Sequence, residues 1–248
     1  MIAPNDEMLL HVWEEHLGSH PVRRAIGALA AAAPERGWEG WARAPIGERD
    51  RALLGLHERL FGSDLHTTAS CPRCGERLES DFTAAQIRSG GSTAASALEL
   101  YEGGFAIECR LPTSEDLLYI AAERQNAQSD SVGDVALLLR RCVSSAHQDD
   151  RSIDPSSLPA NVVDAIASAM ATHDPDADVR IALECPACSY AWELHFDIVS
   201  YFWSELDDWA QRTLADVHAL ASAYGWTEHT VLGLSPIRRR IYLDMVGA

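Results

Sequence analysis

The sequence predicts an α+β fold, in which a mostly helical body carries a small β element built from two segments far apart in the chain. Three observations support this class. Apolar residues recur at helical spacing near both ends of the 248 residues. Two short extended segments each surround a Cys-Pro-x-Cys turn. One stretch in the middle alternates apolar and polar residues, as a half-buried strand does.

Helical spacing accounts for most of the chain. Gly18 ends the first apolar stripe, Pro21 is suited to open the second helix, and Gly62 ends the third. Thr227 and Ser235 are expected caps near the C-terminus. The expected helices cover residues 9–17, 21–33, 48–61, 114–125, 132–147, 161–171, 199–224, 227–232 and 235–246.

The remaining stretches are expected to be strands, turns and loops. Phe105, Ile107 and Cys109 alternate with polar residues, and Pro112 ends this strand. The expected loops and turns are a tryptophan-bearing loop at 37–41, a flexible break at 89–93, a polar loop at 148–152 and a turn at 173–176. We therefore divide the chain into an N-terminal helical segment (1–63), a first hairpin (64–88), a middle strand-plus-helices insertion (89–177), a second hairpin (178–197) and a C-terminal helical segment (198–248).

An internal repeat carries the strongest signal. Residues 64–82 and 178–196 both place an aspartate seven residues before Cys-Pro-x-Cys. Each segment then has an apolar residue, Leu78 or Trp192, four positions after the second cysteine. A glutamate follows directly, and a phenylalanine ends the segment. Each segment therefore reads as a strand, a tight turn and a returning strand, which is the pattern of a zinc knuckle.

The cysteine spacing is typical of a structural zinc site. One Cys-x-x-Cys turn delivers two thiolates, and two such turns complete a tetrahedron around Zn²⁺ at about 2.3 Å. Proline fixes φ inside each turn, and Gly75 allows a positive φ after the first, where Ser189 stands in the second. Four thiolates leave no open position, so the single predicted zinc is structural. Its predicted ligands are Cys71, Cys74, Cys185 and Cys188.

Other interpretations of the cysteines stay open. Either pair could be a redox Cys-x-x-Cys, although neither stands at a helix start after a strand. The pairs could also be half-sites, completed by His66 and His195 or by a second chain. A thiol-based zinc redox regulator is therefore the alternative function. Cys109 and Cys142 lie on apolar faces, so we expect buried core thiols there, with a ligand role as the alternative.

Composition excludes several function classes. The chain carries 37 acidic and 20 basic residues, with a net charge of −17, and every basic residue is arginine. The absence of lysine excludes Schiff-base chemistry, a Walker-A motif and the kinase strand lysine. The net charge disfavours nucleic-acid binding. No signal peptide or membrane span is predicted, because the longest early apolar run covers only residues 28–33. We expect a cytoplasmic protein.

Two groups of residues resemble catalytic or metal sites, but the spacing of their residues does not match that of such sites. His11 and His16 are five residues apart, about 140° around a helix, whereas metalloprotease histidines share one face. Asp174 and Asp176, with Asp178, lack the glycine and the distal glutamate of a calcium loop, so a solvated turn is expected. No catalytic or cofactor-binding residue is predicted.

The C-terminal region offers large apolar and cationic side chains. The arginines at 238–240 are expected to contact a partner or the acidic body of the chain. The aromatic residues fill either the helical core or a partner interface. They are Trp203, Trp209, Tyr224, Trp226 and Tyr242.

The sequence resembles a family encoded beside contractile phage tails and extracellular contractile injection systems, which is related to the baseplate hub assembly proteins of T-even phages. The resemblance covers the chain from about residue 9. It rests on the paired Cys-Pro-x-Cys segments, on residues 110–117 (Arg-Leu-Pro-Thr-Ser-Glu-Asp-Leu) and on C-terminal motifs within residues 223–246. The resemblance implies a non-enzymatic protein that helps to assemble a baseplate or tail by contacting the baseplate or tail proteins.

Overall fold

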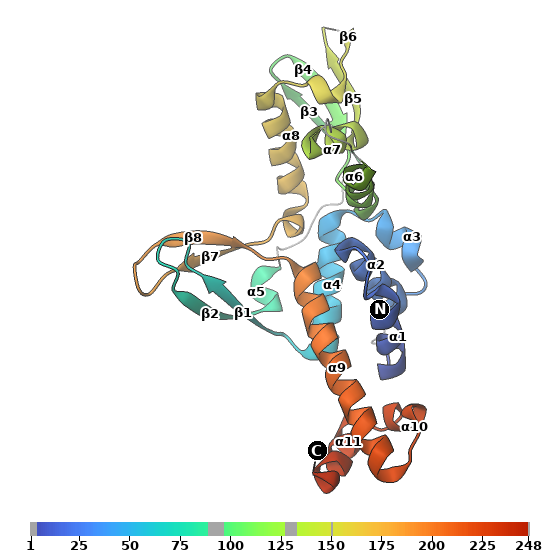
Figure 1. The fold of residues 1–248 in the computed structure, drawn as a ribbon. Coiled ribbons are helices and arrows are strands. Elements are labelled where there is room, and N and C mark those ends of the chain that lie inside the picture. Colours follow the sequence, from blue (N-terminus) through green and yellow to red (C-terminus); the bar gives the residue numbers. More distant parts are fainter. Residues whose placement is uncertain (1–3, 89–96, 127–132, 150, 248) are drawn as a thin grey trace.

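A computed structural model describes residues 4–88, 97–149 without 127–132, and 151–247 (Figure 1). The helices are α1 (Asp6–His16), α2 (Pro21–Ala32), α3 (Gly37–Ala42), α4 (Ile46–Phe61), α5 (Ala84–Ile87), α6 (Ser114–Asn126), α7 (Asp134–Cys142), α8 (Ala160–His173), α9 (Ile198–Tyr224), α10 (Glu228–Leu232) and α11 (Pro236–Val246). The strands are β1 (Asp64–Ser70), β2 (Arg77–Thr83), β3 (Leu98–Glu102), β4 (Phe105–Cys109), β5 (Val143–Gln148), β6 (Arg151–Ser152), β7 (Arg180–Glu184) and β8 (Ala191–His195). This is the predicted mixed α+β fold, mostly helical.

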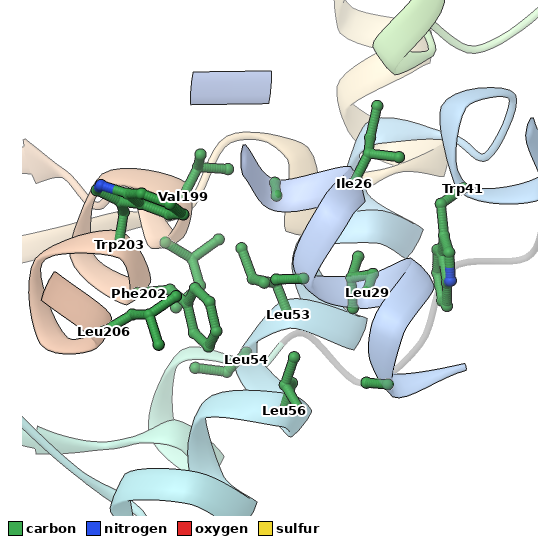
Figure 2. Packing of buried hydrophobic residues seen from close by; sticks show 14 of the residues in the cluster. Ile26, Leu29, Trp41, Leu53, Leu54, Leu56, Val199, Phe202, Trp203 and Leu206 are labelled. Carbon is green, nitrogen blue, oxygen red and sulfur yellow. The ribbon is translucent and has the colours of Figure 1, made fainter. Parts of the chain in front are cut away.

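The main core joins the two ends of the chain. Helices α2 and α4 pack against the first half of α9, and their apolar side chains interlock (Figure 2). Leu29, Leu53 and Phe202 are almost fully buried there. Each such side chain contributes about 1.5–3 kcal/mol by leaving water. The N-terminal helices therefore depend on a helix that begins at residue 198.

Helix α9 is delimited by clear local signals. The Asp197 side chain accepts hydrogen bonds from the backbone N–H groups of Val199 and Ser200, which caps the start of the helix. Gly225 ends it at φ 69°, in the left-handed region. Asp197 follows β8 almost directly, so the second hairpin is joined rigidly to the helix that completes the core.

The middle of the chain forms a separate lobe. Strands β3, β4, β5 and β6 make an antiparallel sheet, and α8 packs beside it (Figure 1). Phe105, Ile107 and Cys109 all point into a second apolar core, as their alternation predicted. At the base of the lobe, the buried Asp116 carboxylate binds the guanidinium groups of Arg110 and Arg141.

A third, smaller core lies at the far end of α9. Helices α10 and α11 fold back against it, around Val231 and Leu243. Thr227 caps α10 and Ser235 caps α11, as expected from the sequence. Figure 1 shows this tip at the opposite end of α9 from the hairpins.

The structure corrects the predicted secondary structure at three places. The helix expected over residues 132–147 ends at Cys142, and the chain continues as β5, which pairs with β4. The expected loop at 37–41 is helix α3. Within the expected polar loop at 148–152, Gln148 ends β5, and Arg151 and Ser152 form β6, which pairs with β5. The predicted flexible break at 89–93 lies outside the described residues.

Within the described parts of the chain, no helix combines the length and the apolar character needed to cross a bilayer.

Candidate metal centre

Two hairpins bring the four predicted ligand residues together. Strands β1 and β2 form one two-stranded sheet, and β7 and β8 form another. The Cys-Pro-x-Cys turns lie between the paired strands, and Figure 1 shows the two hairpins extending side by side from the helical body. Cys74 and Cys185 are 111 positions apart in the chain, so the turns meet only because the body brings the hairpins together.

The two turns have the same backbone hydrogen bonds. The Cys71 N–H donates to Glu76 O (2.8 Å), and the Cys185 N–H donates to Tyr190 O (2.9 Å). Gly75 N–H donates back to the first cysteine of its turn, and Ser189 N–H does the same in the second turn. The two hairpins also share one strand register, because Ala69 pairs with Leu78 as Leu183 pairs with Trp192. The sequence repeat is therefore a structural repeat.

Ser189 adopts the backbone conformation of the glycine that it replaces. Its φ is +52°, and the φ of Gly75 is +78°. Left-handed backbone costs a residue with a Cβ roughly 1–2 kcal/mol. The second turn therefore bears a strain that the first turn avoids, in return for the same cysteine geometry.

The four sulfur atoms lie in one small cluster. The Sγ of Cys71 is 3.7 Å from that of Cys188. The Sγ of Cys74 is 3.6 Å from that of Cys185. All four ligand atoms lie within 4.8 Å of one another, whereas a disulfide bond measures about 2.05 Å. Sulfurs bound to Zn²⁺ at about 2.3 Å would be about 3.8 Å apart, so the arrangement fits a four-thiolate metal ion such as zinc.

The thiols are too close to ionise independently. Desolvation disfavours the Cys71 thiolate, but hydrogen bonds from the backbone of Cys74 and Arg73 lower the pKa of Cys71 to about 7. A hydrogen bond from the backbone of Glu76 favours the thiolate of Cys74. Hydrogen bonds with the sulfur atoms of Cys188, Cys185 and Cys71, together with desolvation, outweigh this effect and raise the pKa of Cys74 to about 12. A bound cation would remove this conflict, because it stabilises all the thiolates at once.

Exposure differs among the four cysteines. Cys71 and Cys185, the first of each pair, are buried, whereas Cys188 is half-buried and Cys74 is exposed. The cluster is therefore partly open to solvent at the turns of the two hairpins. A metal held there by four thiolates would have no free position for a substrate.

The remaining sulfur and imidazole groups stay apart from this cluster. Cys109 and Cys142 are buried in or beside the core of the middle lobe, as expected. His66 Nδ1 lies 2.7 Å from Asp81, and His195 Nε2 lies 3.4 Å from Asp178. Among the described residues, the only group that brings three or more potential metal ligands together is the four cysteines.

The histidines near the N-terminus form no site. His11 is exposed beside Glu15, on the same helix. The ring of His16 packs against Trp38 at 5.9 Å between centroids, and burial lowers the pKa of His16. The two imidazoles therefore occupy different environments.

The expected solvated turn at Asp174 and Asp176 is wrong. Both carboxylates are buried: Asp174 accepts a hydrogen bond from Gly47 N–H (2.8 Å), and Asp176 accepts one from Arg51 Nε (2.6 Å). These two hydrogen bonds attach the segment between α8 and β7 to α4. The acidic spacing alone could not reveal this role, because both partners lie more than a hundred positions away.

The C-terminal candidates divide between core and surface. Arg239 is buried and ion-paired with Asp6 of α1, which is a contact with the acidic body as expected. Trp203 is buried in the main core. Trp226 stacks on Tyr224 at the tip, with centroids 4.7 Å apart, and is half-buried.

Sequence reasoning missed one residue that supports the hairpins. The Tyr201 hydroxyl of α9 accepts a hydrogen bond from the backbone N–H of His66 in β1, at 3.0 Å. This bond attaches the first hairpin to the helix that follows the second. Tyr201 falls within the long helix predicted over residues 199–224, and nothing in its spacing indicates a strand partner.

Comparison with known families decides the identity. A model of the T4 bacteriophage base plate protein family matches residues 34–203, which include both cysteine pairs and the motif at 110–117. The chain belongs to the T4 bacteriophage base plate protein family. The C-terminal motifs within residues 223–246 lie beyond the part of this base plate protein that the family model matches. No curated protein and no solved structure matches the chain.

Proposed function

We propose that this chain is a non-catalytic assembly factor or baseplate component of a phage-tail-like contractile injection system. In this role it acts as a zinc-stabilised protein–protein interaction module. The observation that carries the proposal is the convergence of four thiols in a member of the base plate family. A closed site of this kind supports a fold, and it offers no position for catalysis.

The expected partners are baseplate or tail proteins of the same particle. A net charge of −17 opposes binding to phosphate backbones, so recognition of nucleic acid is not part of the proposal, and neither is a membrane. The chain would act in the cytoplasm, either free or within an assembling particle. Zinc bound by Cys71 and Cys74 together with Cys185 and Cys188 would hold the two hairpins in the relative position that partners recognise.

Genetic complementation tests this function. A producing strain that lacks the gene is complemented with wild type, Cys71→Ser or Cys109→Ser, and complete sheathed particles are counted by electron microscopy. We expect particles with wild type and Cys109→Ser, and a loss of at least tenfold with Cys71→Ser. Normal particle numbers in the deletion strain would reject the assembly role.

A pull-down separates structural assembly from the redox alternative. Affinity-tagged wild-type chain should retain baseplate or tail proteins equally under reducing and mildly oxidising conditions. Recovery of none of these proteins would count against the assembly role. Binding that switches with peroxide, together with zinc release, would instead favour the thiol-based regulator.

A further inference from the structure

Helix α11 buries one face and exposes a stripe of apolar residues on the opposite face. Arg239 and Leu243 are buried against the tip. At about 100° per residue, Ile241 lies roughly 160° around the helix from each of them. Ile237, Ile241 and Met245, which we call the outer stripe, are 75%, 48% and 69% exposed. An apolar stripe on a helix normally packs against another element.

The charged residues beside the outer stripe are arranged asymmetrically. Arg240 and Asp244 lie on one flank, where Arg240 Nε is 3.2 Å from Asp244 Oδ1. Their side chains are 79% and 61% exposed. Arg238 and Tyr242 lie on the other flank, at about 60° and 100° from Ile241. One flank therefore carries both signs of charge, and the other carries a cation beside an aromatic ring.

We propose that the outer stripe pairs with the same stripe of a second copy of this chain, in an antiparallel two-fold arrangement centred on Ile241. Ile237 of each copy then meets Met245 of the other. In an antiparallel two-fold pair, each flank faces the same flank of the partner helix. Arg240 of each copy therefore lies beside Asp244 of the other, so two ion pairs form across the interface.

The parallel arrangement is electrostatically unfavourable. Parallel two-fold helices bring opposite flanks together, which would place Arg238 of one copy beside Arg240 of the other, twice. The antiparallel pair instead places Arg238 beside Tyr242 of the second copy, where a guanidinium is favourable near a ring face. Charge complementarity thus selects both the occupant and its direction.

The position of α11 makes self-association compatible with the net charge. The tip lies at the end of α9, away from the hairpins and from the middle lobe (Figure 1). Two copies joined there keep most of their acidic surface farther apart than the screening length of about 8 Å at physiological ionic strength. One helix pair buries less than the about 1,600 Å² of a standard interface, so we expect a dimer in the micromolar range.

Complementary charge variants test the pairing. Sedimentation equilibrium is measured on the full, metal-loaded chain for wild type, Arg240→Asp, Asp244→Arg and an equimolar mixture of the two variants. We expect wild type to dimerise and each variant alone to dimerise at least tenfold more weakly, because like charges then face each other. In the mixture, position 240 of one variant faces position 244 of the other. The two side chains then carry opposite charges at both contacts, so dimerisation should return as a heterodimer.

The mixture keeps the test independent of folding. Each variant loses an exposed ion pair within its own helix, but that loss is the same with or without the other variant. Arg43→Asp removes another exposed ion pair, the one with Glu115, and should leave self-association unchanged. A wild-type chain that remains monomeric at several hundred micromolar, or a mixture that does not dimerise, would overturn the proposal.

Discussion

The rings of Phe82 and Phe196 pack edge to face, with centroids 5.4 Å apart and an interplanar angle of 87°. These two residues occupy the same position in the two copies of the sequence repeat. The hairpins therefore meet at two places, through their cysteines at the turns and through these rings at the root beside the helical body. The ring contact holds the hairpins together without any metal.

Coupling between the two rings can be measured by a double-mutant cycle of Phe82→Leu and Phe196→Leu. Edge-to-face pairs contribute about 0.5–1.5 kcal/mol beyond area burial, so the double variant should be less destabilised than the sum of the singles by this amount. Urea unfolding of the metal-loaded chain provides the free energies. Strict additivity would mean that the ring contact contributes nothing specific.

The metal site predicts a stoichiometry. Wild type purified without chelators should contain one zinc per chain, whereas Cys71→Ser should contain none and unfold at a markedly lower temperature. Structural zinc sites contribute on the order of 10 kcal/mol to folding. Mass spectrometry under native conditions distinguishes zinc from iron, which also accepts four thiolates.

Cys109→Ser is the matched control for this experiment, because Cys109 is a buried thiol outside the cluster. It should retain one zinc per chain, although burying a hydroxyl costs stability. A wild-type chain that binds no metal after refolding with excess zinc would contradict the site.

Relieving the strain at Ser189 should stabilise the chain. Ser189→Gly removes the Cβ from a residue with φ +52°, and we expect a gain of about 0.5–1 kcal/mol in the free energy of unfolding, with unchanged zinc content. Ser80→Gly in β2 is the control, because glycine in a strand loses about 0.5–1 kcal/mol. A loss of stability in both variants would show that the positive φ costs the second turn nothing.

The buried carboxylate of Asp116 predicts a pH dependence. Burial favours its neutral form, but hydrogen bonds from Arg110, Thr113 and Arg141 outweigh this effect and hold the pKa of Asp116 far below its usual range. A carboxylate whose pKa is lowered by folding contributes stability above its unfolded pKa of about 3.9. That contribution is lost as the pH falls from about 4 towards the lowered folded value.

Asp116→Asn should therefore lose about 2–4 kcal/mol at pH 7 and show a flatter stability profile below pH 4 than wild type. Urea unfolding at several pH values measures both effects. Glu115→Gln, which changes a neighbouring but partly exposed carboxylate, should change stability by less than about 1 kcal/mol. Equal effects of the two substitutions would exclude a special role for the buried carboxylate.

The sequence contained enough local information to predict the two hairpins and most helix ends. The repeat aligned the cysteines, and caps such as Thr227 and Ser235 indicated where helices begin. Strand β5 was missed because nothing punctuates its start: Val143 follows Cys142 without a glycine or proline, and only pairing with β4 extends the backbone there. The preference for a strand at this point comes from tertiary contact, which a single sequence does not display.

The buried aspartates show the same limitation. Asp174 and Asp176 stand in a polar, proline-containing stretch that is typical of an exposed turn. Their partners, Gly47 and Arg51, belong to α4, and spacing within the turn carries no information about a helix so distant in sequence. Similarly, the sequence predicted the last helix but could not show which face of α11 is buried and which is exposed.

The placement of the middle lobe between the hairpins determines when a newly synthesised chain can complete its fold. At about 5–20 residues per second, a ribosome needs roughly 6–22 s to translate the 111 positions from Cys74 to Cys185. During this interval the nascent N-terminal helices expose the apolar surface that α9 later covers. The main core of this base plate protein can therefore close only after the ribosome has synthesised the first half of α9, whereas the middle lobe has its own core and does not depend on that helix.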